Sequence, residues 1–414
     1  MNEWIKKPEL LAPAGSYENL VTAVKYGADA VYMGGSALGL RAKAKNFTKE
    51  EMIAGIAYAR ANNVKAYVTA NVFAHNEDIQ TARKYLVEIG EEIKPDALIV
   101  ADPGLLMLVR EVLPDMEVHM STQANNTNYL TYRFWFQQGV KRAVLARELS
   151  LKEIVEIKAN IPYDMEIEGF VHGAMCMSYS GRCLISNFLT GQDANRGSCT
   201  QSCRWKYHLV EETRPGEYMP VMEDEKGTYF FNSKDLCMIN HLEDVIPAGI
   251  DSLKIEGRMK TPLYIATVVK AYRQAIDLFF ENPQEYEKKK DYFLEEVGKC
   301  SHRHFDTGFF YGIPENGQIY ENSSYIKDYV FTAKVIGFDE KTGLHHIEQR
   351  NKFSVGDDLE ILTQRGENLQ FKVGEILTET GETKESATLA KEKLYLRLPG
   401  RIEPETIIRK PSRV

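Results

Sequence analysis

The stretch PELLAPAGSYENLVTAVKYGADAVYMGG, residues 8–35, carries the pattern that decides the fold. Two short apolar runs, 8–15 and 30–35, flank an amphipathic segment with helical period. Apolar runs without alternation are typical of strands that are buried on both faces, as in a parallel sheet. The stretch therefore predicts a strand, a helix and a second strand that together start an α/β fold.

Six further apolar runs continue this pattern, at 65–73, 97–102, 117–123, 142–150, 165–173 and 252–258. Capping boxes that begin at Thr48 and Ser150 predict the starts of two intervening helices, and Pro262 suits the first turn of a long helix over about 262–281. Eight strands that alternate with helices predict a TIM-barrel-like (β/α)8 domain. A doubly wound open sheet is the alternative, but no G-x-G-x-x-G motif follows the first strand.

The patterns divide the chain into three regions. Residues 1–281 are expected to form the barrel domain, which contains a cysteine-rich insertion at 173–251 that is far longer than an ordinary β/α connection. Residues 282–328 are interpreted as a polar connector. From 329 to 414 the hydrophobic period changes to two, between Gly-containing turns, which predicts a small all-β barrel.

Composition limits the class of protein. The chain has 414 residues and a net charge of −8, which excludes coating of nucleic acid by bulk positive charge. A local basic patch remains, because residues 391–414 hold seven Lys or Arg against three Glu. The N-terminal residues lack the apolar run of a signal peptide, and no stretch approaches about 20 apolar residues. We therefore expect a cytoplasmic protein without a membrane anchor.

The cysteines are clustered. Four of the six, Cys176, Cys183, Cys199 and Cys203, follow the spacing C-x6-C-x15-C-x3-C. In a cytosolic protein such clusters more often bind metal or do redox chemistry than form disulfides. Four thiolates in one Gly-containing loop fit a tetrahedral site for zinc or a 4Fe–4S cluster. The alternative is a set of buried free cysteines, because Cys is a common core residue.

Polar residues at the strand ends supply further candidates, because the active sites of TIM barrels lie at the carboxyl ends of the strands. The candidates for acid–base chemistry are Glu168, His172, Asp102 and Gln123, and those for substrate binding are Arg147, Arg258, Asn71 and Arg41. Arg147 and Arg258 are able to clamp carboxylates with two hydrogen bonds each. Salt bridges and strand-end hydrogen bonds are the structural alternative for the same residues.

The run from Glu168 to Ser186, E-x-F-x-x-G-A-M-C-x4-G-x-C-x-I-S, resembles the signature of the collagenase-like peptidases of family U32. The segments PELLAPAG (8–15), GADAVYMGG (27–35) and KIEGR (254–258) are similar to that family as well. The resemblance implies a peptidase, but the chain has no H-E-x-x-H and no G-x-S-x-G motif. Cys176 with His172 is the remaining arrangement for hydrolysis.

Within this family, the length, the C-x3-C pair before Arg204–Trp205 and the β domain resemble the members that modify tRNA. The resemblance implies conversion of wobble uridine to 5-hydroxyuridine, with prephenate as cosubstrate and tRNA as partner. It implies a 4Fe–4S cluster on Cys176, Cys183 and Cys199, with Cys203 or alternatively Cys237 as the fourth ligand. A homodimer or a heterodimer with a paralogue is a further expectation. The open alternatives are a collagenase-like peptidase that uses zinc or a cysteine nucleophile, and a non-catalytic RNA-binding or assembly subunit.

Overall fold

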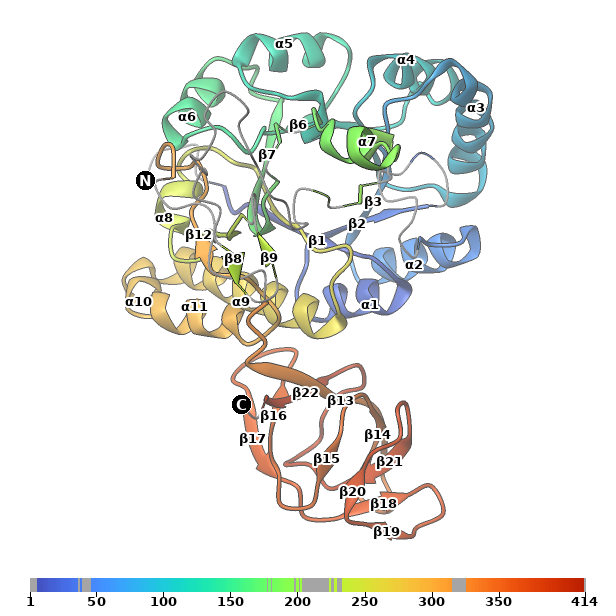
Figure 1. Ribbon diagram of the computed structural model, residues 1–414, viewed down its shortest axis with the longest axis vertical. Coiled ribbons are helices and arrows are strands. Elements are labelled where there is room, and N and C mark those ends of the chain that lie inside the picture. Colours follow the sequence, from blue (N-terminus) through green and yellow to red (C-terminus); the bar gives the residue numbers. More distant parts are fainter. Residues whose placement is uncertain are drawn as a thin grey trace. The chain divides into compact units, whose positions relative to one another are not determined.

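The computed structural model of the chain describes residues 6–35, 38, 46–176, 178–179, 181–196, 199–200, 202, 223–224, 227–228, 233–314 and 325–412. The chain forms two compact units (Figure 1). The first comprises Met1–Leu20, Asp29–Met259 and Arg303–Tyr325, and the second comprises Val21–Ala28, Lys260–His302 and Ile326–Val414.

A closed barrel of eight parallel strands forms the first unit. The strands are β1 (Glu9–Pro13), β2 (Ala30–Gly34), β3 (Lys65–Ala70), β4 (Ala97–Val100), β5 (Val118–Met120), β6 (Arg142–Val144), β7 (Glu166–Ala174) and β11 (Ser252–Ile255). Each pairs in parallel with the next, and β11 pairs with both β7 and β1. This closure confirms the predicted TIM-barrel-like domain and excludes the open sheet, in which the first and last strands stay unpaired.

Helices follow most of these strands, and α2 to α6 surround the barrel in Figure 1. The helices up to β11 are α1 (Tyr17–Lys25), α2 (Lys49–Ala61), η1 (Asn76–Asp78), α3 (Ile79–Glu88), η2 (Ile89–Ile93), α4 (Pro103–Val112), η3 (Thr122–Ala124), α5 (Tyr129–Gln137), α6 (Leu151–Ala159), α7 (Ile185–Thr190), η4 (Ala194–Arg196) and α8 (Leu242–Val245). The capping boxes predicted at Thr48 and Ser150 are confirmed at the starts of α2 and α6. No helix in the described part of the chain is long and apolar enough to cross a membrane.

Four short strands accompany the insertion and the segment beyond the barrel. They are β8 (Glu223–Asp224), β9 (Gly227–Thr228), β10 (Asp235–Cys237) and β12 (Phe305–Asp306). Strand β10 pairs antiparallel with the second half of β7, and β12 pairs with β10. The insertion therefore ends by extending the barrel wall beside β7, the strand that leads to the first clustered cysteine.

The barrel interior contains charges as well as an apolar layer. The apolar layer consists of Leu11, Ala30, Tyr32, Tyr67, Ala97 and Ile99. Arg142, whose side chain is 4% exposed, lies 2.6 Å from Glu9, 2.7 Å from Glu166 and 3.3 Å from Glu168. Lys254 Nζ donates a 2.6 Å hydrogen bond to Glu168. Burial alone would raise the pKa of Glu168, but the charges of Lys254 and Arg142 lower that pKa below its usual value, so Glu168 is ionised.

The second unit combines three helices with an antiparallel sheet. The helices are α9 (Pro262–Glu281), α10 (Pro283–Lys288) and α11 (Lys290–Gly298). The strands are β13 (Tyr329–Asp339), β14 (Leu344–Gln349), β15 (Phe353–Ser354), β16 (Asp358–Leu362), β17 (Leu369–Lys372), β18 (Ile376–Thr378), β19 (Thr383–Lys384), β20 (Ser386–Ala387), β21 (Lys393–Leu396) and β22 (Ile407–Pro411). Eight of them form one sheet in the order β17-β16-β22-β13-β14-β21-β18-β19. This sheet confirms the predicted all-β C-terminal fold.

Buried charges also lie in the second unit. Arg409 is fully buried, contacts Glu360, and lies 2.8 Å from Glu296 of α11. Lys270 of α9 donates hydrogen bonds to Thr363 Oγ1 at 2.9 Å and to Asn368 Oδ1 at 2.6 Å. Burial lowers the pKa of Lys270 from 10.5 to about 8.

We expect this lysine to make the stability of the second unit depend on pH. Between about pH 8 and 10.5 the unfolded chain still binds the Lys270 proton whereas the folded chain has released it, so the stability contributed by this group rises with pH. Thermal unfolding of the wild type and of Lys270→Met between pH 7.5 and 10 measures this effect. The melting temperature of the wild type should increase relative to that of the variant, and parallel curves would contradict the assignment.

Candidate active site at the barrel mouth

Arg147, which follows β6, is held at the mouth by β7. Its Nη1 donates a 2.8 Å hydrogen bond to the carbonyl of Ala174, and its guanidinium lies 3.9 Å from the ring centre of Phe170. Its Nη2 is 3.8 Å from a carboxylate oxygen of Glu256. Its Nε is buried and makes no hydrogen bond within the described residues. One edge of the guanidinium is therefore held by the backbone of β7, while the hydrogen-bonding capacity of Nε is unused within the described residues.

Arg258, which follows β11, reaches across the ends of β1 and β2. Its Nη1 donates a 3.2 Å hydrogen bond to Thr69 Oγ1 of β3. A Cβ on Gly34 would lie 2.2 Å from this Nη1, and a Cβ on Gly15 would lie 1.7 Å from the Arg258 carbonyl oxygen. Glycines at both strand ends therefore make the room that Arg258 occupies.

Lys254 is a third cation beneath these arginines. Its Nζ lies 4.5 Å from the ring centre of Tyr32 and 5.3 Å from that of Phe170, the ring that Arg147 also covers. Its salt bridge with Glu168 is the structural alternative that the sequence left open for Glu168. Glu168 is fully buried, and its salt bridge holds the Lys254 ammonium in place beneath the mouth.

Two other predicted residues meet at the ends of β3 and β5. Asn71 Nδ2, after β3, donates a 2.8 Å hydrogen bond to Gln123 Oε1, after β5. Asp102 instead caps α4, where its carboxylate accepts a 2.8 Å hydrogen bond from the Leu105 N–H. Arg41 lies outside the described residues. The structure thus supports a mouth position for Asn71 and Gln123 and gives Asp102 a helix-capping contact.

The cysteine segment lies against the same strand ends. The Phe73 N–H donates to the Asn195 carbonyl at 3.3 Å, and Asn195 Nδ2 donates to the Cys183 carbonyl at 2.9 Å. A Cβ on Gly181 would lie 2.3 Å from the Gln123 carbonyl oxygen, so only glycine permits this approach. The segment 181–196, which contains α7, is therefore anchored at the ends of β3 and β5 (Figure 1).

The described thiols differ in burial. Cys176 and Cys199 are exposed, Cys183 is half-buried, and none of the three forms a disulfide. Cys237 is buried in β10, where the antiparallel register places it opposite His172 of β7. Cys203 lies outside the described residues. The structure thus gathers three of the predicted ligands in one segment by the mouth, and it places the alternative fourth ligand on the strand beside β7.

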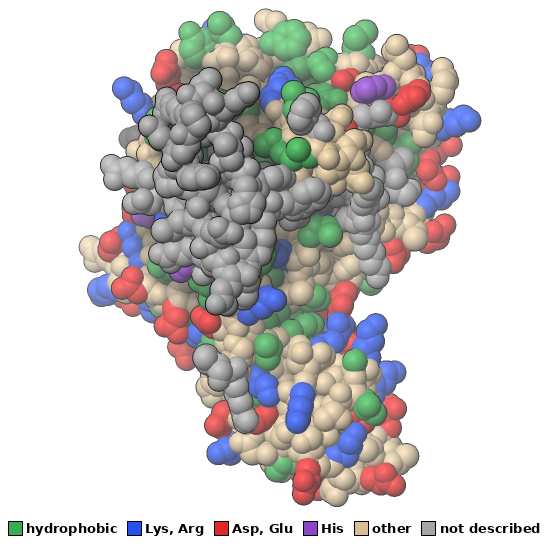
Figure 2. All heavy atoms as spheres, in the orientation of Figure 1, with side chains coloured by type: hydrophobic (Ala, Val, Ile, Leu, Met, Phe, Trp, Pro, Cys, Tyr) green, Lys and Arg blue, Asp and Glu red, His purple; other side chains and the backbone are tan. Residues whose placement is uncertain are grey.

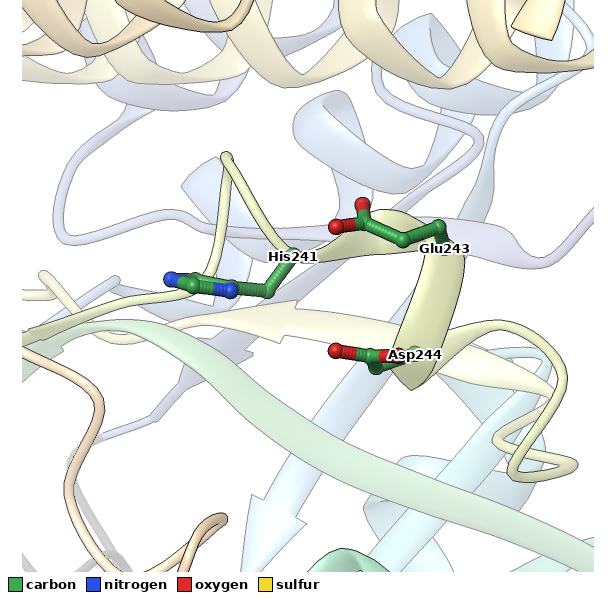
Figure 3. Close-up of side chains that lie close together, drawn as sticks. All are labelled: His241, Glu243 and Asp244. Carbon is green, nitrogen blue, oxygen red and sulfur yellow. The ribbon is translucent and has the colours of Figure 1, made fainter. Parts of the chain in front are cut away.

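In the ranges that the structure describes, one group of three potential ligands has its ligand atoms within 4.8 Å of one another: His241, Glu243 and Asp244, at the start of α8 (Figure 3). The Tyr311 hydroxyl donates to Asp244 at 2.5 Å and lies 3.0 Å from His241 Nδ1. Among the described residues, the cysteines form no such group.

Comparison with known families decides the classification. Residues 15–320 match the model of peptidase family U32, and residues 327–409 match that of the peptidase family U32 C-terminal domain. The chain belongs to peptidase family U32. This confirms the resemblance that the cysteine signature indicated.

Relatives that match most of this U32 chain include proteins named for tRNA hydroxylation and a protein named collagenase. The chain is 42% identical to tRNA hydroxylation protein P1 of Bacillus subtilis (98% of this chain, 95% of the relative) and 40% identical to tRNA hydroxylation protein P of Escherichia coli (91% and 90%). It is 32% identical to a collagenase of Porphyromonas gingivalis (92% of each). Among solved structures, the U32 peptidase Mk0906 is 14% identical, with a TM-score of 0.39, over 60% of this chain and 93% of that one.

Some residues at the barrel mouth of this U32 chain were not predicted as site residues from the sequence. Lys254, Thr69 and Tyr32 were not singled out, because each lies within a strand and not at its end. The sequence carried one signal for Lys254, which is a lysine within the otherwise apolar run of β11. Lysines buried in strands are rare unless they are paired. Thr69 and Tyr32 carried no comparable signal.

Replacing Gly15 by alanine is expected to disturb the mouth. The added methyl would collide with the backbone of Arg258, so we expect a loss of about 1–3 kcal/mol in unfolding free energy. Gly374→Ala is the matched control, because nothing lies within 4 Å of a Cβ there, and its effect should stay within about 0.5 kcal/mol. Chemical denaturation of both variants tests the difference, and equal effects would refute the close approach.

Proposed function

We propose that this U32 protein hydroxylates tRNA, converting the wobble uridine to 5-hydroxyuridine. The observation that carries this proposal is the 42% identity to tRNA hydroxylation protein P1, which extends over 98% of this chain and therefore covers both units. The mouth supports it, because cysteines that form no disulfide and cationic side chains lie at the ends of the same set of strands. This combination suits a redox reaction in which an anionic cosubstrate takes part.

A 4Fe–4S cluster is the cofactor that we propose. Cys176, Cys183 and Cys199 would hold it, with Cys203 or Cys237 as the fourth ligand. The donor chemistry fits, because none of the three described thiols forms a disulfide and Cys183 lies in the segment that is anchored at the mouth. When bound, the cluster would supply one-electron transfer beside the barrel mouth.

Prephenate is the cosubstrate that we propose for the arginines. It carries two carboxylates, and guanidinium groups bind carboxylates through paired hydrogen bonds. The Arg147 Nε makes no hydrogen bond within the described residues, and a shift of the side chain would bring this buried group to such an oxygen. Arg258 would take the second carboxylate, and Lys254 would add positive charge below both.

The amide pair at the ends of β3 and β5 suits a nucleobase. Asn71 and Gln123 are joined by a 2.8 Å hydrogen bond, and side-chain amides carry both the donor and the acceptor groups that pair with the polar edge of uracil. His172 is almost fully buried in β7, where it lies opposite Cys237 of β10. In this proposal it would therefore support the cysteine segment and not contact the base.

Mass spectrometry of tRNA nucleosides tests the proposal directly. The gene is expressed in a bacterial strain that lacks its own tRNA hydroxylation proteins, and 5-hydroxyuridine is measured in bulk tRNA. We expect the modified nucleoside to appear, and to decrease when prephenate synthesis is blocked. Its absence in cells that contain the folded protein would overturn the proposal.

A collagenase-like peptidase is the second candidate, favoured by the 32% identity to a protein named collagenase. The geometry gives it less support. Cys176 is exposed beyond the end of β7, whereas His172 is 1% exposed within that strand. Gelatin hydrolysis by the purified protein tests this function. We expect none, and hydrolysis that disappears in Cys176→Ala would establish the peptidase instead.

A non-catalytic RNA-binding or assembly subunit is the remaining alternative. Bacillus subtilis has two relatives, tRNA hydroxylation proteins P1 and P2, which are 42% and 39% identical to this chain. A homodimer or a paralogue heterodimer would accordingly be the functional form. Binding of tRNA without modification by the isolated chain would favour this alternative.

A further inference from the structure

The outer face of the C-terminal sheet carries a stacked aromatic pair. The rings of His346 in β14 and Tyr395 in β21 have centres 4.8 Å apart and planes inclined by 18°. The two residues are direct cross-strand partners, which explains the stacking. Their neighbours Ile347 and Leu394 point into the core, so the pair stands on the outer side of the sheet.

The strand on the other side of His346 leaves space beside the imidazole. Strand β13 places Gly337 opposite His346. A Cβ at Gly337 would meet only the Cβ of His346, at 3.8 Å, and no other heavy atom within 4 Å. No side chain from this position covers the second face of the imidazole, so a flat ring is able to stack there.

Cations flank this aromatic pair. Lys393, Tyr395 and Arg397 alternate along β21 and its continuation, and alternating residues of a strand share one face. Lys393 and Arg397 are exposed, and so is Lys391 before the strand. Lys and Arg side chains are visible on the face of this unit that Figure 2 shows.

Carboxylates near the pair are mostly engaged by other cations. Glu348, opposite Lys393, lies 2.7 Å from Arg350, and Glu392 lies 2.5 Å from Lys384. Glu379 lies 3.3 Å from His346 Nε2. The exposed Lys393 and Arg397 remain as positive charges beside the stack.

Other basic residues of the C-terminal segment are engaged by carboxylates. Arg409 is fully buried among carboxylates, Lys410 lies 2.9 Å from Asp357, and the exposed Arg401 lies 2.7 Å from Glu340. Arg413 lies outside the described residues. The single basic patch expected at 391–414 is therefore wrong as a unit, and its exposed unpaired part is the β21 face.

We propose that this face binds RNA, with an unpaired base stacked on His346 above Gly337 and the adjoining phosphates held by Lys393 and Arg397. Aromatic rings flanked by cations are the usual way in which proteins bind single-stranded RNA. The space between the His346 ring and Gly337 is called the ring slot. A flat slot with cations beside it suits a nucleotide better than an extended peptide or a lipid headgroup. The inference rests on the proposed tRNA substrate and adds a second contact, in the C-terminal unit, to the barrel mouth.

Binding of an unmodified tRNA transcript to the full chain, measured by fluorescence anisotropy at several salt concentrations, tests the proposal. Lys393→Gln/Arg397→Gln should weaken binding about tenfold and reduce the slope of log affinity against log salt by about two. Gly337→Leu should fill the slot and weaken binding about five- to one-hundred-fold without changing that slope. Arg365→Gln/Lys372→Gln, which removes two exposed charges around β17, is the matched control and should bind like the wild type.

The outcomes separate this inference from the proposed function. If the wild type binds tRNA and the β21 and Gly337 variants bind equally well, the surface proposal is overturned and tRNA hydroxylation stands. If the wild type neither binds nor modifies tRNA, the proposed function fails and this inference fails with it. Circular dichroism melting of each variant confirms that the sheet is folded in the binding assay.

Discussion

Replacing Arg142 by methionine is expected to lower the unfolding free energy of the barrel unit by about 3–5 kcal/mol. The side chain is 4% exposed and lies within 3.3 Å of three carboxylates, those of Glu9, Glu166 and Glu168. Without the guanidinium, Glu168 keeps only Lys254 as a cationic neighbour, and Glu9 is left as a poorly solvated negative charge. Chemical denaturation followed by circular dichroism at pH 7 measures the loss.

A surface ion pair provides the control for this prediction. Arg83 and Glu111 form a pair at 2.8 Å with side chains 41% and 61% exposed. Arg83→Met should cost no more than about 1 kcal/mol, because exposed pairs are well solvated in the unfolded chain as well. If Arg142→Met lowers the unfolding free energy as little as Arg83→Met does, the buried salt bridges of Arg142 do not stabilise the barrel.

Replacing Cys183 by serine is expected to remove the proposed cluster and the modified nucleoside together. Loss of outer partners alone changes metal affinity about 10- to 100-fold, so loss of a direct ligand should reduce iron content and 5-hydroxyuridine by about 100-fold or more. Iron and sulfide are measured in anaerobically purified protein, and the nucleoside is measured in tRNA from cells that express the variant.

Cys300→Ser is the matched control for the cysteine prediction. Cys300 is fully buried in the second unit and donates to the Val297 carbonyl at 3.3 Å, a contact that a serine hydroxyl is able to keep. Both readouts should match the wild type. Cys203→Ser and Cys237→Ser, compared in the same way, identify the fourth ligand as the one whose loss removes iron. Full iron content in Cys183→Ser would contradict the proposed ligand set.

Local pattern was sufficient wherever the deciding contacts lie close together along the chain. The stretch 8–35 predicts two strands and a helix, and the structure has them at Glu9–Pro13, Tyr17–Lys25 and Ala30–Gly34. The caps at Thr48 and Ser150 were equally predictable, because each hydrogen bond spans three residues. The cysteine signature, a run of residues within one segment, was sufficient to indicate the family.

Partners of charged residues were not predictable in this way. Arg409 was expected in a surface patch, yet it is buried against Glu296 and Glu360, which lie 113 and 49 positions away along the chain. Asp102 was predicted as an acid–base candidate from its place after β4, and the folded chain shows that its carboxylate also caps α4. A charged side chain has the same local pattern whether it is solvated or paired, since pairing depends on which strands become neighbours.

The order of apolar runs, the turn residues and the cysteine spacing thus specify the barrel, the β domain and the family from sequence, because hydrophobic period and backbone preference act over a few residues. The closure of β1 on β11, the approach of Arg258 to Gly15, and the salt bridge between Lys254 and Glu168 arise only in the folded chain. Each joins residues from separate strands, so its geometry depends on the register of the sheet. Strand register is a property of the whole closed barrel, to which every strand contributes.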